Sequence, residues 1–141
     1  MSYAPKNFTA SATLTGSDAD TILTINAAAG LTLTLPAASG SGRKFEIYIG
    51  TTVTSNAALI KVANASDAMR GLCISAADGG NTVNGWEVAT NDDTISFNGS
   101  TTGGIVGDRV ELVDCAANVW SVLAYTASTD NEATPFSATV S

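Results

Sequence analysis

The stretch Leu31-Thr32-Leu33-Thr34-Leu35-Pro36 decides the class of this fold. Its leucines and threonines alternate strictly, so the leucines point to one face of an extended chain and the threonines to the other. This period of two is typical of a strand with one buried face. Pro36 ends the strand because proline has no N–H to donate to a neighbouring strand. A second strand is expected over residues 21–26, and Gly30 in the short loop between the two runs predicts a hairpin.

Similar runs recur along the chain at short intervals. Strands are expected over residues 44–50, 58–62, 69–75, 94–98, 108–114 and 119–125. The last two are joined by Ala116-Ala117-Asn118 and form a second expected hairpin, while Asp78-Gly79-Gly80-Asn81 and Asn84-Gly85 predict turns. No segment carries a helical stripe. The pattern predicts an all-β fold, a small antiparallel β-sandwich or barrel of the jelly-roll kind.

The length of 141 residues suits one domain, and 45% hydrophobic residues suffice for a core. Residues 1–10 show no clear period and contain Pro5, so we expect an extended N-terminal arm, called the arm below. The β-domain is expected over residues 11–126. Residues 127–141 are mostly polar and are expected to form a C-terminal tail or an edge strand.

Composition excludes several classes of function. The chain has no histidine and two cysteines, which excludes a Ser-His-Asp triad, His-ligated metals and a four-thiolate zinc site. Its net charge of −7 would repel a phosphate backbone, so no nucleic-acid partner is expected. No apolar run approaches the ~20 residues that span a bilayer, and residues 1–6 lack an apolar signal core, so no secretion signal is expected. We therefore expect no cofactor, no membrane association, synthesis in the cytoplasm and free thiols.

The acidic residues have three possible roles: a calcium site, a pair of catalytic carboxylates or a solvated acidic rim. A calcium site needs converging oxygens in a regular loop, and paired catalytic carboxylates need a cleft that is usually lined with aromatics. The chain has no D-x-D-x-D-G spacing and only 6% aromatics, which favours a solvated acidic rim. The candidates for all three interpretations are Asp78, Glu87, Asp92, Asp93 and Asp114.

The cysteines and the Gly-Ser-Gly stretch are expected to have structural roles. Cys73 and Cys115 are expected to be small buried hydrophobes, with a disulfide as the alternative. Residues 40–44 (GSGRK) resemble a phosphate loop, but they run into a strand and open no helix, so a turn is expected.

The aromatic residues suggest where contacts lie. Trp120 lies in an alternating strand and is expected in the core, whereas Trp86 is either a core residue or a contact anchor. Tyr3 and Phe8 in the arm imply that the arm docks, either on another protein or on its own domain.

Several stretches resemble small virion proteins of tailed bacteriophages. They are Leu33 to Gly42 running into Phe45 to Gly50, Gly107 to Asp114 followed by Trp120-Ser121-Val122, and Ala133-Thr134-Pro135-Phe136, within residues 31–136. The resemblance implies a capsid decoration (cement) or head-fibre protein. Such a protein is no enzyme, is commonly a homotrimer, and attaches non-covalently to the major capsid protein on the outer surface of the virion.

Two sets of contact residues follow from this expectation. Shell contact is placed in the arm, with candidates Tyr3, Pro5, Lys6 and Phe8. The alternative function is a receptor- or carbohydrate-binding β-module of a phage fibre, in which exposed aromatic rings stack on sugars. Trp86 and Tyr48 are the first candidates for that ligand or partner contact.

Overall fold

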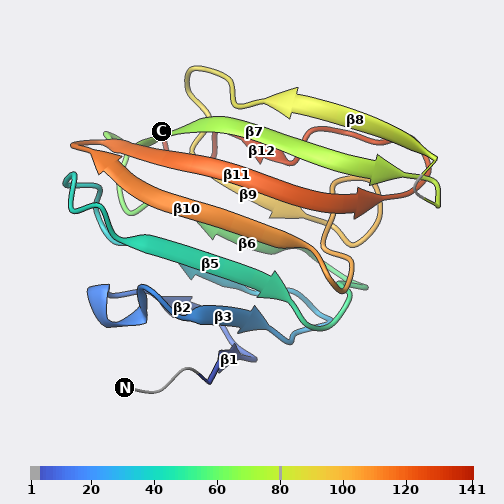
Figure 1. Cartoon of the computed structure of the whole chain (residues 1–141), viewed down its shortest axis with the longest axis horizontal. Coiled ribbons are helices and arrows are strands. Elements are labelled where there is room, and N and C mark those ends of the chain that lie inside the picture. Colours follow the sequence, from blue (N-terminus) through green and yellow to red (C-terminus); the bar gives the residue numbers. More distant parts are fainter. Residues whose placement is uncertain (1–3, 80) are drawn as a thin grey trace.

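Two packed β-sheets form the computed structural model, which describes residues 4–79 and 81–141 (Figure 1). In chain order the elements are β1 (Lys6–Phe8), β2 (Ala12–Thr13), the 3₁₀ helix η1 (Gly16–Asp18), β3 (Ile22–Ile25), β4 (Thr32–Thr34), β5 (Lys44–Ile49), β6 (Ala58–Lys61), β7 (Ala68–Ala77), β8 (Thr82–Glu87), β9 (Thr94–Phe97), β10 (Arg109–Ala116), β11 (Val119–Ser128) and β12 (Phe136–Ser137). The expected all-β sandwich is confirmed.

The sheets contain seven and five strands. The larger has the order β1-β3-β5-β10-β11-β7-β8 and the smaller the order β12-β9-β6-β4-β2. In Figure 1 the larger sheet faces the viewer, from β1 at the bottom to β8 at the top. Both sheets are mixed, whereas the alternation suggested antiparallel sheets, because five of the strand pairs are parallel. Alternation reports burial of one face and carries no information on strand direction.

The first six strands alternate between the two sheets. β1, β3 and β5 run parallel in the larger sheet, while β2, β4 and β6 run parallel in the smaller one. The hairpin expected from residues 21–26 and 31–35 is therefore wrong, because β3 and β4 lie in opposite sheets. Each run buries one apolar row, and the loop between them lets these rows meet across the core rather than side by side.

The second half of the chain contains true hairpins. β10 and β11 pair antiparallel, as predicted, with a bulge between Asp114 and Ala116. β7 and β8 also pair antiparallel, and the turn at Asp78-Gly79 leads from one towards the other. Asn84-Gly85 makes no turn, since both residues lie inside β8. Cross-strand pairing with β7 prevails over the local turn preference there.

The core lies between the sheets and joins the two halves of the chain. Trp120 of β11 is 1% exposed, which confirms its predicted place, and its ring meets Phe45 of β5 edge to face at 5.6 Å. Cys73 is buried as expected, but Cys115 is exposed because it lies at the bulge that ends β10. Both thiols are free.

A short strand near each end of the chain lies at a sheet edge. Within the arm, β1 pairs with β3 in the larger sheet, and Phe8 is 8% exposed. The arm thus packs on its own domain along residues 6–8. In the C-terminal segment, Phe136 and Ser137 form β12, which pairs with β9 at the edge of the smaller sheet.

Candidate interaction surface

The outer face of β11, β7 and β8 carries an apolar surface. Side chains alternate along each strand, and the residues between the buried ones point away from the core. Tyr125 lies opposite Ile74, Leu123 opposite Leu72, and Ala76 lies between Ala127 and Val83. Val106, from the loop before β10, lines the same surface. We call this surface the apolar face; its members are Leu72, Ile74, Ala76, Val83, Val106, Leu123, Tyr125 and Ala127.

The apolar face gathers the exposed large hydrophobic residues of the part of the chain that the structure describes. Leu72, Ile74, Val83, Val106 and Tyr125 are between 36% and 65% exposed, and they all belong to this one surface. Isolated exposed hydrophobic residues are common on proteins, but a contiguous group marks a contact site. The surface is suited to binding another molecule.

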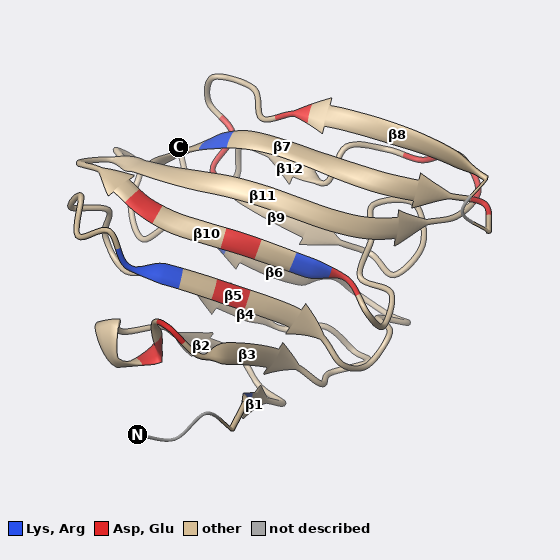
Figure 2. Ribbon diagram, viewed as in Figure 1, with Lys and Arg blue, Asp and Glu red and all other residues tan. Residues whose placement is uncertain are grey.

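Paired charges border the apolar face along β5 and β10. Lys44 lies 3.3 Å from Glu111, and Arg109 lies 2.7 Å from Glu46, with all four side chains on the outer surface. β11 itself contains no charged residue, as Figure 2 shows. The outer surface of one sheet is thus divided into a polar half and an apolar half.

A buried carboxylate fixes the loop that carries Val106. Asp108 accepts hydrogen bonds from the backbone N–H groups of Gly104, Ile105 and Ala127 at 2.8–3.1 Å. Burial raises the pKa of Asp108, and these three donors offset the rise only in part. The same carboxylate therefore holds this loop against β11, beside the apolar face.

Asp114 holds the loop over residues 39–41. Its carboxylate accepts hydrogen bonds from the backbone N–H groups of Ser39, Gly40 and Ser41 and from both serine hydroxyls. Burial alone would raise the pKa of Asp114, but these donors outweigh it and lower the pKa to about 2. The loop that resembles a phosphate loop therefore binds an anion belonging to the chain itself.

Asp93 fixes the C-terminal residues in the same way. Its carboxylate accepts hydrogen bonds from the backbone N–H groups of Thr139, Val140 and Ser141 and from the hydroxyl of Thr94. Burial raises its pKa, but the donors, Thr139 first, outweigh burial and lower the pKa to about 2. The interpretation as a solvated rim is wrong for Asp93 and Asp114, which are buried structural groups. No local pattern marks them, because donors such as Ser39 and Thr139 lie 75 and 46 residues away.

The other acidic candidates are more exposed than Asp93 and Asp114. Asp78 and Glu87 are exposed, and half-buried Asp92 accepts the N–H of Ala89. Within residues 4–79 and 81–141, no group of three or more metal-ligating side chains converges.

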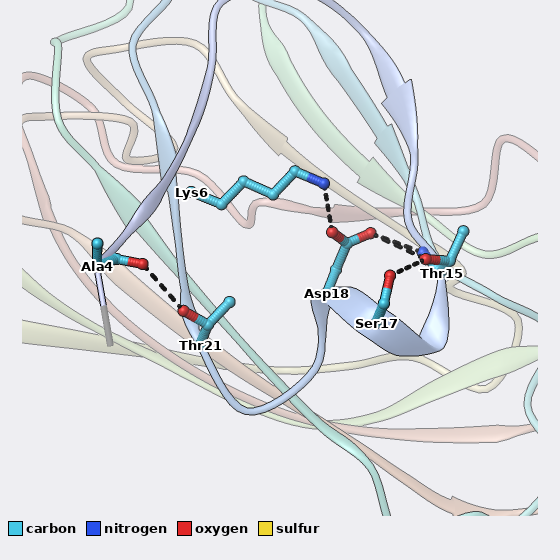
Figure 3. Close-up of polar contacts among 6 residues, drawn as sticks. All are labelled: Ala4, Lys6, Thr15, Ser17, Asp18 and Thr21. Carbon is cyan, nitrogen blue, oxygen red and sulfur yellow. Dashed lines mark hydrogen bonds and ion pairs between the residues drawn. The ribbon is translucent and has the colours of Figure 1, made fainter. Parts of the chain in front are cut away.

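Two of the four candidate contact residues of the arm, Lys6 and Phe8, are engaged within the fold, and Figure 3 shows the contact of Lys6. Lys6 donates to buried Asp18 at 2.5 Å, and its ammonium lies 5.3 Å from the centre of the Phe8 ring. Asp18 also accepts the N–H of Thr15. Burial would raise the pKa of Asp18, but Lys6 and Thr15 outweigh it and leave the pKa below its usual value. Pro5 is exposed, and Tyr3 lies outside the described residues.

The two candidate ligand aromatics lie on opposite faces of the larger sheet. Trp86 pairs with buried Cys73 and packs against the core, while Tyr48 alternates with buried Ile47 and Ile49 and points outward. They cannot form one stacking platform. Sequence reasoning missed the apolar face; the ten uncharged residues of β11, with Leu123 and Tyr125 on outward positions, indicate only the part that β11 contributes.

Comparison with known proteins identifies no relative: no family model, curated protein or solved structure matches the chain. Among the described residues, no helix is long and apolar enough to cross a membrane.

Proposed function

We propose that this chain is a structural protein of a bacteriophage virion, which decorates and stabilises the capsid by non-covalent attachment to the major capsid protein. The observation that carries this proposal is the apolar face. A chain with a net charge of −7 that nevertheless exposes Ile74, Val83 and Tyr125 side by side has a surface made for contact with protein. The proposed activity is binding alone, without catalysis.

Rigidity supports the same role. Five buried aspartates tie loops or termini to the sandwich, among them Asp93, Asp108 and Asp114. A decoration protein has to keep its shape on a shell, and buried carboxylates that accept several backbone N–H groups hold loops in one conformation. As a homotrimer, such a module would attach through several weak contacts acting together.

The place of shell contact follows from the arm. Lys6 and Phe8 hold β1 on the sandwich, so in this proposal they position the arm. Contact with the shell then falls to the exposed part of the arm around Pro5.

Co-sedimentation with capsids tests the proposed function. Purified chain is mixed with mature heads of the phage or prophage that carries the gene, and the pellet is compared with one that contains an unrelated acidic protein. We expect saturable binding with a fixed number of copies per head. A chain that stays in the supernatant at micromolar concentration overturns the proposal.

A further inference from the structure

The distribution of charge indicates which partner the apolar face accepts. The outward positions of the larger sheet carry three positive and three negative side chains: Lys44, Arg70, Arg109, Glu46, Glu87 and Glu111. They cancel, so the net charge of −7 is carried by the rest of the chain. Figure 2 shows charged residues on β5, β10, β7 and β8 and none on β11.

A neutral face permits association with a like partner. Two copies of this chain repel one another through their acidic surfaces, but little when their neutral faces meet. On β10, Arg109 lies opposite Tyr125 and Glu111 lies opposite Leu123, so both signs border the apolar residues and a rotated copy can present opposite charges to them. A basic partner would instead be attracted to the acidic remainder of the surface.

The shape of the face agrees with a second sheet as its occupant. The face is a sheet surface with one shallow hollow of about 430 Å³, bordered by Ile74, Val83, Val106 and Tyr125. Broad sheet faces bury their side chains well against other sheet faces. At the margin lies β8, and among the described residues no strand pairs with its outer edge. Association of copies here would also shield that edge.

We infer that a second copy of this chain covers the apolar face, so that the face is where the subunits of the oligomer meet. The inference deepens the role proposed above and rests on it for the assumption that this face works by binding protein. β1 of the arm lies at the opposite edge of the larger sheet from β8, so the arm can still contact the shell.

Light scattering on two matched variants tests the inference. Ile74→Glu places a charge in the apolar face, and Thr34→Glu places the same charge on the outer surface of β4, opposite Lys61. Both variants have the same net charge, so general repulsion is equal. We expect the wild type and Thr34→Glu at two or three times 14.2 kDa. For Ile74→Glu we expect at least about a hundredfold weaker association, because a buried charge would lack a partner.

A second variant guards against misfolding. Val83 is 65% exposed, so Val83→Glu should fold like the wild type by circular dichroism and still dissociate. A wild type that stays at 14.2 kDa at micromolar concentration, or a Val83→Glu oligomer as tight as the wild type, overturns the inference.

Capsid binding separates the two proposals. An oligomer that depends on Ile74 but never binds capsids supports the inference and removes the proposed function. A monomeric wild type that binds capsids through Ile74 overturns the inference and supports the proposed function, since the face would then meet the shell directly.

Discussion

The strands β1 to β6 and the strands β7 to β12 share one core but treat their outer surfaces differently. The first half winds between the sheets, and its outward positions carry polar side chains such as Thr24, Thr34, Glu46 and Lys61. The second half is built on two hairpins, and its outward positions on β7, β8 and β11 are largely apolar. The outer surface of the first half is therefore polar and suited to solvent, whereas the second half exposes apolar side chains that another molecule can cover.

The largest effect is expected where the halves meet. Trp120 of the second half packs on Phe45 of the first, and Trp120→Ala removes a fully buried indole. We expect a loss of about 3–5 kcal/mol in the free energy of unfolding, still with one transition, because both halves share the core. Denaturant titration with two spectroscopic probes measures this. Two separate transitions, or a loss under about 1 kcal/mol, would show that the halves are independent or that this contact is minor.

The open end of the first half gives the next effect. Deleting residues 1–8 removes β1, with buried Phe8 and the Lys6–Asp18 ion pair. We expect a loss of about 2–4 kcal/mol in unfolding free energy, most of it from Phe8. Thermal unfolding checks this, with Lys6→Ala as a control that should lose at most about 1 kcal/mol, because Lys6 is half exposed. An unchanged melting temperature would mean that β1 adds nothing to the sandwich.

Acid should weaken the hydrogen bonds that the carboxylates of Asp114 and Asp93 accept. The pKa of Asp114 and of Asp93 is about 2 in the folded chain, below the ordinary value of 3.8. A lowered pKa contributes stability above the unfolded value, and this stability is lost as pH falls from about 4 to about 2. Each tie should be worth on the order of 2 kcal/mol at neutral pH.

Denaturant titrations at a series of pH values test these ties. Asp114→Asn and Asp93→Asn should each lower stability at pH 7 and flatten its decline in acid. Asp108 opposes this trend, since its raised pKa removes stability as pH rises above the ordinary value. An acid decline as steep in both variants as in the wild type would contradict the assignment.

Sequence alone predicted the strands better than their partners. Alternation in residues 31–35 and 44–49 located buried faces, since burial is local and has a period of two. The alternation carried no information on which sheet β3 or β4 would join, because that choice depends on how distant strands share the core. The buried aspartates were missed for the same reason: the donors to Asp114 and Asp93 lie about 75 and 46 residues away. The apolar face needed the order of β11, β7 and β8 before its members became neighbours.

Two tyrosine variants should change stability least but should differ most clearly in association, because one lies on the polar part and the other on the apolar face of the larger sheet. Tyr48 and Tyr125 both point outward and lie on either side of Arg109, but Tyr48 belongs to the polar half and Tyr125 to the apolar face. Tyr48→Ser and Tyr125→Ser should each change unfolding free energy by less than about 1 kcal/mol, because neither ring is in the core. Association should weaken about tenfold or more for Tyr125→Ser alone, since exposed tyrosines are strong contact residues once covered. Sedimentation of both variants over a range of concentrations measures this difference. Equal association of the two variants would mean that the copies do not meet through the apolar face.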